Sequence, residues 1–471
     1  MSQDTRPGVV PAGSRAAERA GGRRLGLVLG MLVLPMYVAL GAPSVALPSV
    51  SRSLAVPFGA TAWVLAAWSL TSALAMPVAG RLLVRWSPFR LLVTGVVTLA
   101  VGSALAAAGP TLPVVIAGRL VGGAGAGTTV IAVFAAATAL PGRQRLRTLG
   151  IIAAASATAS GCGTLLGGAV TSWLGWRAVI ALPVLALLFL PAALPSRRAL
   201  ARTGERNGPT DRFDVAGAAV LSVLASSVIT VLQAHAVGLP ALVTIVVAAA
   251  GVLAAAGLWW HVRRTPDGFV PRRVIASRGF LTAGLLGGAV FAGYYGVLFR
   301  APSLIEQLTG GGPLRAGVLL VPAAVCSVLA GRSVGALSDR FTGWRVSAGL
   351  AVLTVTGVLV VAFSIGPVPV VVGTALTVCG FAGAQAVLVG LVPDLVAASD
   401  RDTAQSLLNF MNTLGGGIGP AVVAGLSGVV PATAALAVLA ALPLAGLAVS
   451  LPLARQRVAT PEKSAHPASP R

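Results

Sequence analysis

The sequence predicts an all-α membrane protein with 14 transmembrane helices. Three observations predict this class: about fourteen apolar blocks run through the chain, hydrophobic residues make up 56% of it, and charged residues make up only 10%. A helix of about 20 apolar residues is long enough to cross a hydrocarbon core of about 30 Å. Each block must be a helix because lipid offers no partner to a free backbone N–H or C=O group.

The apolar blocks give the predicted helices in order, separated by short loops. The predicted spans are 25–49, 59–79, 91–108, 111–139, 149–171, 176–195, 214–234, 239–260, 279–300, 314–333, 346–366, 368–392, 403–427 and 431–453. The first block is too long for a secretory signal and thirteen more follow it, so it is interpreted as a span. Because the number of spans is even, both ends of the chain are expected on one side.

The basic residues predict which side this is. Most of the 34 Lys and Arg residues fall in the two tails or in alternate loops, whereas the other loops hold Arg52, Arg177, Arg300 and Arg315. Lys and Arg in short loops resist translocation across the membrane. We therefore predict cytoplasmic termini in a multi-pass protein of the cell membrane, the plasma or inner membrane.

Charge and cysteine usage argue against several other classes. The net charge is +22, but the basic residues are dispersed over short loops, whereas a nucleic-acid-binding protein needs a basic face on a soluble domain. Cys162, Cys326 and Cys379 lie in predicted spans without the spacing of metal ligands. We expect no nucleic-acid partner, no metal, no cofactor and no enzymatic activity.

An internal repeat divides the chain into two similar groups of helices. GRLLVRWSPFR at 80–90 follows the second span as GALSDRFTGWR at 335–345 follows the tenth, and Gly163 and Gly419 match at nearly the same offset. Repeated groups of helices are how many transporters build two halves around a midplane site. The expected regions are a cytoplasmic tail 1–24, a six-helix half 25–195, a cytoplasmic loop 196–213, two linking helices 214–260, a cytoplasmic loop 261–278, a six-helix half 279–453 and a cytoplasmic tail 454–471.

The same segments carry a family resemblance. GALSDRFTGWR, with Gly335, Asp339, Arg340 and Arg345, resembles the loop motif of the major facilitator superfamily. RLVGGAGAG at 119–127 resembles its fourth-span motif, and GCGTLLGG at 161–168, followed by Trp-Arg, resembles the antiporter motif of its fifth span. From about 25 to 453 the chain resembles transporters of the fourteen-span drug:proton antiporter type. The resemblance implies the MFS fold and multidrug or antibiotic efflux.

The chain also departs from the family pattern at four positions. By alignment Ala39 stands where the family usually has an Asp, and Val84 replaces the Asp of the first loop motif. Gly122 replaces a Gln after the fourth-span Arg, and Thr164 replaces the Pro of the antiporter motif. The sequence therefore lacks several groups that the family uses in proton-coupled transport.

Arg119 is the one basic residue predicted well inside a span, away from its ends. A charged side chain near the middle of a membrane helix costs at least about 2.5 to 3.5 kcal/mol on insertion scales, so Arg119 should have polar partners. It is either a cavity-lining charge that tunes a proton-binding partner or attracts an anionic substrate group, or an Arg that reaches the outer interface and bonds carbonyls.

The acids offer few proton sites, because none of the twelve is predicted deep in a span. A proton antiporter needs a group whose protonation changes with its exposure, and a carboxylate within the membrane is the usual one. Glu306, just after the ninth span and near Arg300 and Arg315, is the best candidate. The alternative is an extracellular salt bridge that contributes little.

Two further sets of residues are assigned to conformational change. The predicted gating loop contains Gly335, Asp339, Arg340 and Arg345, with Asp339 on a tight turn where its carboxylate can meet a helix N-terminus or a neighbouring Arg. Its alternative is an acid paired only for topology. The predicted helix-packing motif contains Gly161, Gly163, Gly167 and Gly168, which place small residues on one helix face.

The substrate class follows from the missing deep acids. A lipophilic cation in a low-dielectric cavity is best held by a carboxylate, so a neutral or anionic lipophilic compound is favoured. The side chains expected to face the cavity, each of which could instead belong to an interfacial belt or to helix contacts, are Tyr37, Trp63, Trp68, Tyr294, Tyr295, Gln385, Asn409 and Asn412.

The predicted function, largely implied by the resemblance, is a monomeric secondary transporter in the lipid bilayer. It would export a hydrophobic compound, such as an antibiotic or toxic metabolite, in exchange for protons by rocking its two halves around a midplane cavity. Two alternatives stay open: an uncoupled facilitator or importer of the same fold, and a membrane sensor that transports nothing.

Overall fold

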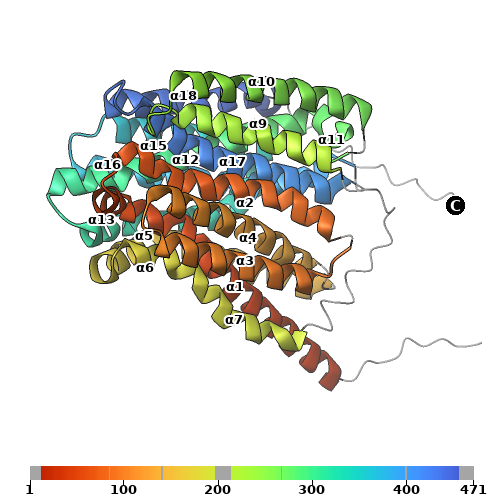
Figure 1. Ribbon diagram of the computed structural model, residues 1–471. Coiled ribbons are helices and arrows are strands. Elements are labelled where there is room, and N and C mark those ends of the chain that lie inside the picture. The colour runs from red at the N-terminus through yellow and green to blue at the C-terminus, as the bar shows by residue number, and fades with distance from the viewer. Residues whose placement is uncertain are drawn as a thin grey trace, which may run out of the picture.

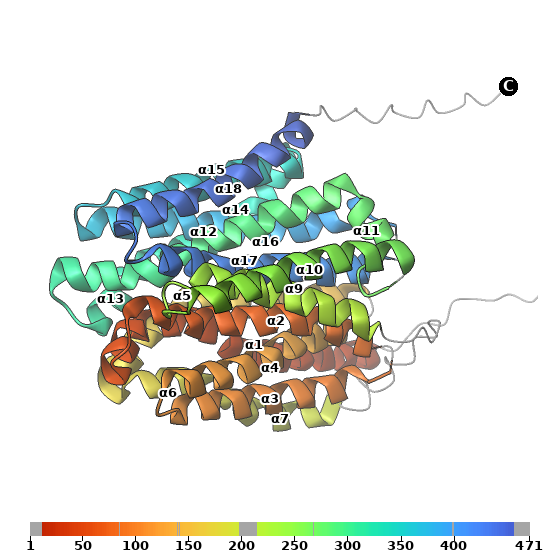
Figure 2. The same ribbon diagram turned by 45° about the horizontal axis from the view of Figure 1, so that its top comes forward.

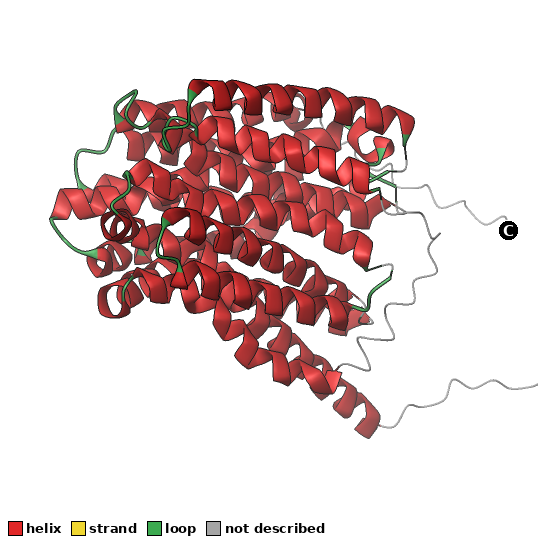
Figure 3. Cartoon of the chain, viewed as in Figure 1, coloured by secondary structure: helices red, strands yellow, loops and turns green. Residues whose placement is uncertain are grey.

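The computed structural model describes residues 12–83, 85–138, 140, 142–196, 214–266, 268–397 and 400–455. These residues form long helices that run side by side, with no strand among them (Figure 1, Figure 3). Parts of the predicted tails, nearly all of the predicted loop 196–213, and Val84 lie outside the described ranges. The prediction of an all-α protein is confirmed.

The helices fall into three consecutive groups. The N-terminal group contains α1 (Ala12–Leu54), η1 (Phe58–Thr61), α2 (Ala62–Leu82), α3 (Pro88–Ala108), α4 (Leu112–Thr138), α5 (Gly142–Leu174), α6 (Trp176–Ala181), η2 (Leu182–Leu185), α7 (Ala186–Ala193) and η3 (Leu194–Ser196). The linking group contains α9 (Val215–Gln233), α10 (Ala241–Arg264) and α11 (Arg272–Ala276). The C-terminal group contains α12 (Arg278–Thr309), α13 (Pro313–Leu319), α14 (Val321–Arg340), α15 (Gly343–Ala362), α16 (Pro367–Leu395), α17 (Arg401–Leu426) and α18 (Ala432–Arg455).

Every one of the predicted spans coincides with helix. Among the described residues, 13 helices are long and apolar enough to cross a membrane. The predicted fifth span falls in α5, where only the stretch Cys162–Leu174 qualifies as an apolar helix of shorter length. The structure is therefore that of a multi-pass membrane protein.

Two predicted spans are interrupted at a proline. The sixth splits into α6, η2 and α7, with Pro183 at the start of η2. The tenth splits at Leu320 between α13 and α14, with Pro322 at the start of α14. Proline has no backbone N–H to donate and clashes with the carbonyl four residues earlier, so the regular hydrogen-bonding pattern breaks there.

The ninth predicted span is longer in the structure than the sequence suggested. It was expected to end at residue 300, but α12 continues to Thr309 and ends where Gly310 adopts a left-handed conformation with φ of 62°. Glycine reaches this conformation without the penalty that a Cβ atom brings, and it commonly ends helices in this way. The extension places Glu306 in the last turns of α12 and not, as expected, just outside the span.

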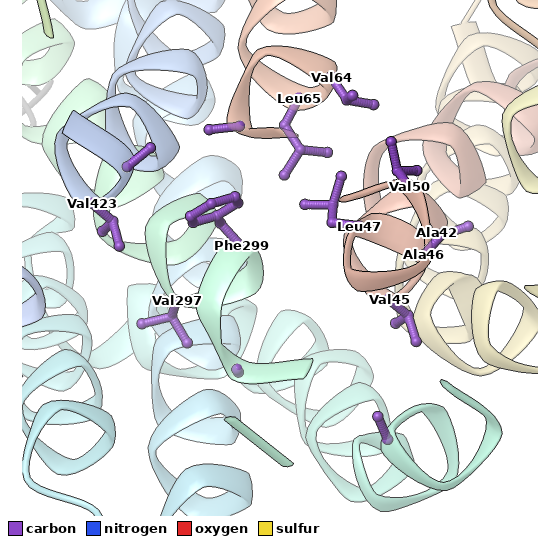
Figure 4. Close-up of a cluster of buried hydrophobic side chains, with 14 of the residues drawn as sticks. Ala42, Val45, Ala46, Leu47, Val50, Val64, Leu65, Val297, Phe299 and Val423 are labelled. Atoms are coloured by element: carbon purple, nitrogen blue, oxygen red, sulfur yellow. The ribbon is translucent and has the colours of Figure 1, made fainter. Parts of the chain in front are cut away.

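One hydrophobic cluster joins the N-terminal and C-terminal groups at one end of the bundle. We call the end where α1 begins and α18 ends the tail end, and the opposite end the distal end (Figure 1, Figure 2). At the distal end Leu47 and Val50 of α1 and Leu65 of α2 face Phe299 of α12 and Val423 of α17 (Figure 4). This distal cluster closes the space between the two groups.

The tail-end core is divided in two. One cluster belongs to the N-terminal group and includes Leu32 of α1 and Val133 of α4. The other belongs mainly to the C-terminal group, with Leu286 of α12 and Leu408 of α17, and takes in Leu70 of α2. Apart from the face of α2 that packs on α17 and Leu40 of α1, which packs against both clusters, the two groups therefore have separate cores at this end.

The linking helices cover the line where these two groups meet. Figures 1 and 2 show α9 beside both α2 and α17, and α9 packs against both helices. The side chain of Ile229 on α9 reaches Gly417 of α17 next to Ser69 of α2. α10 packs on α9 and leaves most of its own surface exposed.

Glycines set the closest contacts between helices. A Cβ atom on Gly419 of α17 would overlap the backbone carbonyl of Ala292 on α12. In the predicted packing motif, Gly163 and Gly167 lie against α1 near Ala42, and Gly168 lies against Pro313 of α13, which belongs to the C-terminal group. The surroundings of the fourth member, Gly161, lie outside the described part of α5.

We predict that Gly419→Ala destabilises the protein. The new methyl group would have to push α12 and α17 apart, and overpacking of this kind costs about 1 to 3 kcal/mol. The matched control is Gly390→Ala on α16, where nothing lies within 4 Å of the added atom. The melting temperature of the purified protein should fall for Gly419→Ala only; equal melting temperatures for the two variants would contradict the close contact.

Candidate transport site

Arg119 lies buried between three helices of the N-terminal group. Its side chain projects from α4 about two turns from the helix start and is 1% exposed. Its Nε donates to the Val64 carbonyl of α2 at 2.8 Å, and its Nη2 donates to the Ala39 carbonyl of α1 at 3.3 Å. The guanidinium also lies 4.1 Å from the ring centroid of Trp68. Arg119 thus connects α4 to α1 and α2.

No carboxylate balances this buried charge within the described part of the chain. Carbonyl groups and the face of Trp68 supply partial negative charge, and a desolvated cation–π contact contributes about 2 kcal/mol. Nη1 of Arg119 has no hydrogen-bond partner among the described residues. An unpaired charge in a water-poor site attracts any anionic group that reaches it. The arrangement is suited to an anion and repels a cation.

An aromatic cluster forms on the C-terminal side. Tyr294 stacks on Phe381 of α16 with ring centroids 4.2 Å apart, and Tyr295 contacts Tyr294 at 4.9 Å. Phe291 completes the cluster, 4.6 Å from Phe381. Tyr37 of α1 is partly buried and packs against the distal cluster and the tail-end cluster of the N-terminal group. The structure brings two of the predicted cavity residues, Tyr294 and Tyr295, together here.

Sequence reasoning missed Phe291 and Phe381. A phenylalanine within an apolar span has the same local pattern whether it faces lipid, a neighbouring helix or a cavity. Only the position of α16 against α12 reveals that Phe381 stacks on a tyrosine. A single sequence contains no signal for this contact.

The other predicted cavity residues have different surroundings. Asn412 on α17 is 1% exposed, lies beside Gly287 of α12, and neither polar atom of its amide has a partner among the described residues. Buried amides normally have hydrogen bonds, so Asn412 has donor and acceptor capacity to offer a ligand. Gln385 and Asn409 are partly buried, and Trp63 packs against the tail-end cluster of the C-terminal group. Trp68 lies under Arg119.

Glu306 contacts the opposite group of helices. Its Oε2 lies 3.9 Å from Nη1 of Arg52 at the end of α1, and its Oε1 has no partner among the described residues. The Glu306 side chain is only 10% exposed, whereas that of Arg52 is 66% exposed. The ion pair therefore joins the N-terminal and C-terminal groups at the distal end, with its carboxylate largely withdrawn from solvent.

The two arginines expected near Glu306 have other contacts. Arg300 donates to the Ser303 hydroxyl at 3.0 Å and lies over the ring of Phe58, while Arg315 donates to the Thr309 carbonyl at 3.1 Å. Phe58 in turn stacks on Phe299 across the two groups, with centroids 5.0 Å apart. An ion pair and an aromatic stack thus lie together at the distal contact.

The predicted gating loop is partly helical. Asp339 was expected on a tight turn, but α14 continues to Arg340, so the backbone of Asp339 belongs to the last helical turn. The side-chain surroundings of Gly335 and Asp339 lie outside the described part. Arg340 is exposed, and Nε of Arg345 donates to the Ala454 carbonyl at 3.2 Å, which joins α15 to the end of α18.

A polar network holds the linking helices at the tail end. The Asp214 carboxylate accepts hydrogen bonds from the backbone N–H of Gly217 and of Phe269, both at 2.8 Å, and from Nε2 of His261 at 2.8 and 2.9 Å. Burial alone would raise the pKa of Asp214, but these hydrogen bonds hold that pKa below its ordinary value. Arg81 of α2 joins the network by donating to the carbonyl of Gly268.

The described residues contain no group of three or more His, Cys, Asp or Glu that could hold a metal ion. The polar groups described above can bind organic anions, hydrogen-bonding ligands and protons.

Comparison with protein families and solved structures shows which proteins this chain is similar to. The model of the Major Facilitator Superfamily matches residues 27–420. In three dimensions the chain is similar to the crystal structure of the POT family transporter PepTSo, with a TM-score of 0.68 and 13% identity over 92% of this chain and 98% of that chain. This similarity concerns the fold alone.

The similarity to curated relatives covers most of this chain but not the full length of each relative. An uncharacterised MFS-type transporter of Mycobacterium tuberculosis (strain CDC 1551 / Oshkosh) is 27% identical over 89% of this chain, which spans 62% of that protein's length. Multidrug resistance protein Stp of the same strain is 26% identical over 84% of this chain and 73% of its own. Methylenomycin A resistance protein of Streptomyces coelicolor (strain ATCC BAA-471 / A3(2) / M145) is 27% identical over 87% and 86%.

We predict that Asp214→Asn lowers the melting temperature in a pH-dependent way. Because the pKa of Asp214 is lower in the folded state than its ordinary value of about 3.9, its stabilising contribution is present above about pH 4 and disappears as pH falls through the folded-state pKa. The wild type should therefore melt several degrees above the variant at pH 7, and the two should converge in strong acid. Asp394→Asn, at an exposed position, is the control and should match the wild type throughout.

Proposed function

Because the chain belongs to the Major Facilitator Superfamily, we propose that it exports a hydrophobic small molecule, such as an antibiotic or a toxic metabolite, by alternating access in exchange for protons. The observation that carries this proposal is the contact between Glu306 and Arg52, because it places a withdrawn carboxylate between the two groups of helices. The names of the multidrug and methylenomycin A resistance relatives support drug efflux. The protein would work as a monomer.

The membrane topology is proposed to be fourteen spans in a 6+2+6 order with both termini cytoplasmic. The distribution of arginines supports this orientation, and a helix at each predicted segment supports the number, with α5 as the fifth span. The tail end would then face the cytoplasm and the distal end the outside.

Alternating access requires that the seal between the halves move from one end to the other. The distal cluster, which includes Leu47, Leu65 and Phe299, supports a conformation closed to the outside. Export would require this cluster to separate, while the tail-end clusters and the α14–α15 segment with Gly335, Asp339, Arg340 and Arg345 come together. Residues 25–195 and 279–453 would rock as two bodies.

Glu306 would couple this motion to protons. In the closed distal end, Arg52 lies 3.9 Å away and favours the charged carboxylate, whereas withdrawal from solvent favours the neutral acid. When the distal end opens, both influences are lost and Glu306 meets external solvent. The affinity of Glu306 for a proton would therefore change with the conformation, which is what coupling requires.

The substrate is proposed to be a neutral or anionic lipophilic compound. Arg119 has an unpaired Nη1 and no carboxylate partner among the described residues, which disfavours a cation near it. Aromatic contacts would come from Tyr294 and Tyr295, and hydrogen bonds from Asn412. One observation favours a second candidate, an uncoupled facilitator: Ala39 contributes only a carbonyl to Arg119, so no proton can be exchanged between these two residues.

We predict that Glu306→Gln abolishes proton-driven transport but not the substrate pathway. Glutamine keeps the size of the protonated acid and cannot lose a proton. Uptake of a panel of lipophilic antibiotics and dyes into everted vesicles should depend on the pH gradient in the wild type. In Glu306→Gln, gradient-driven uptake should fall to the level of vesicles with a collapsed gradient, while exchange of labelled for unlabelled substrate continues.

Arg315→Gln is the matched control, because Arg315 is a basic residue near the same end whose hydrogen bond among the described residues goes to the Thr309 carbonyl of its own group. It should leave gradient-driven uptake intact. Full gradient-driven uptake in Glu306→Gln would show that another residue couples transport to protons. Uptake in the wild type that does not depend on the gradient would favour the uncoupled facilitator.

We further predict that Ala39→Asp reduces the preference for anions. A carboxylate at position 39 would lie near the guanidinium of Arg119 and compensate its charge. Inhibition of uptake by a lipophilic anion, deoxycholate, should weaken by about tenfold or more, since losing a desolvated charge partner costs more than about 1.4 kcal/mol. Ala39→Asn, with nearly the same volume and no charge, should behave like the wild type; equal weakening in both variants would point to a packing effect.

A further inference from the structure

The exposed face of α10 ends in two arginines, each of which lies over a tryptophan. Arg263 lies 3.6 Å from the ring centroid of Trp259, and Arg264 lies 4.2 Å from that of Trp260. Each pair has a spacing of four residues, so helix geometry places each arginine one turn beyond its tryptophan, toward the tail end. The tryptophans are 61% and 56% exposed, so the rings face outward from the bundle.

These pairs continue two apolar stripes along the helix. Exposed residues recur at seven-residue spacing: Ile245 and Val252 precede Trp259 in one stripe, and Val246 and Leu253 precede Trp260 in the other. Seven residues are nearly two helical turns, so each stripe drifts only about 20° per repeat and runs almost parallel to the helix axis. Each stripe is about 21 Å long at 1.5 Å per residue, which is comparable with a lipid acyl chain.

The opposite face of α10 is occupied by α9. Gly251 lies against Ser227, and Gly257 faces Val220. Because α9 packs against one face of α10, the large apolar side chains of both stripes lie on the opposite, exposed face. The exposed stripes are therefore a consequence of how the linking pair packs and not of a loosely held helix.

Neither arginine is neutralised within the part of the chain that the structure describes. Both guanidinium groups are exposed, and the tryptophan rings are their recorded contacts. A flat ring holds the guanidinium plane in place while leaving its N–H groups free to donate. Two such groups on adjacent helix positions, at the level of the Trp side chains that favour the membrane interface, can attract a lipid phosphate and donate hydrogen bonds to it.

We propose that α10 carries a binding site for one anionic phospholipid, whose phosphate is held by Arg263 and Arg264 and whose acyl chains lie along the two stripes. Charge complementarity selects an anionic headgroup such as phosphatidylglycerol over a zwitterionic one, because two cations with no acidic partner among the described residues gain little from a headgroup that carries its own ammonium. The site lies on the linking pair, one helix away from the α2–α17 contact that α9 covers.

The chain offers a matched control for this proposal. Arg90 also lies over a tryptophan, 4.6 Å from the ring centroid of Trp86, and it is exposed on α3 at the same end of the bundle. It has one arginine and one tryptophan where α10 has two of each. Loss of Arg90 removes one such charge and one contact of the same kind without touching the proposed site.

The test is a titration of the purified full-length protein in detergent with dioleoylphosphatidylglycerol or dioleoylphosphatidylcholine, followed by native mass spectrometry to count bound lipids. The wild type should bind one phosphatidylglycerol saturably and bind phosphatidylcholine more weakly. The double variant Arg263→Gln/Arg264→Gln should bind phosphatidylglycerol about 30-fold more weakly, since each basic residue near an anionic lipid contributes about 1 kcal/mol. Arg90→Gln should bind as the wild type does.

Several results would overturn the proposal. They are equal retention of the two lipids by the wild type, undiminished binding in the double variant, or an equal loss in Arg90→Gln. Competition by soluble glycerol 1-phosphate as strong as that by phosphatidylglycerol would identify a free-phosphate site instead. A monomer–dimer equilibrium that shifts in Trp259→Leu/Trp260→Leu would assign the stripes to a second copy of the chain. The variant Arg263→Lys/Arg264→Lys, which keeps both charges, should retain most of the binding and so separates charge loss from misfolding.

Discussion

Each membrane helix must form the hydrogen bonds of its own backbone N–H and C=O groups, and the rest of the structure depends on this constraint. In lipid the hydrophobic effect cannot drive helices together, because lipid tails are as apolar as leucine, so association relies on close packing and on a few polar contacts. The glycines of α17 meet this need directly: Gly419 lets α17 touch the backbone of α12 at Ala292. In α5, Gly167 and Gly168 do the same for α1 and α13, so a single helix contacts both groups.

The same constraint bears on Arg119, which is buried, and on Glu306, which is partly buried. Within the described part of the chain, Arg119 bonds to α1 and α2 and to its own group's tryptophan, so its partners would move with it in the proposed rocking motion. Glu306 pairs with a residue of the other group, so its partner would leave if the distal end opened as proposed. A site that exchanges protons must change its surroundings during the cycle. By this reasoning Glu306 is suited to coupling and Arg119 to holding a ligand or a helix.

The sequence predicts the helices well because length and apolar composition decide whether a segment crosses a membrane. It does not predict where a helix is interrupted: Pro183 coincides with a break, whereas Pro77 lies within an uninterrupted α2. It placed Glu306 outside the ninth span because the polar residues near it resemble a loop, although the left-handed Gly310 is the true end of the helix.

Contacts between distant segments are beyond what one sequence can predict. Arg52 and Glu306 lie in different halves, and no local pattern connects them; proximity in sequence favoured Arg300 and Arg315 as partners. Tyr294 and Tyr295 do lie together, but Phe381, the ring that packs against both, belongs to another helix. Local patterns therefore identified polar and aromatic residues, and only the packing of helices showed which ones meet.

The linking pair is more than a connection between two halves. α9 packs on α2 and α17, the helices whose contact runs along the whole interface, with Gly80 beside Ser406 at one end and Gly417 beside Ser69 further along. The loop after α10 is held to α2 through Arg81 and to the start of α9 through Asp214. Any rocking that separates α2 from α17 must therefore slide against α9 or carry it along. A molecule bound to the outer face of the linking helices α9 and α10 can then change the energy needed to separate α2 from α17 without contacting the substrate.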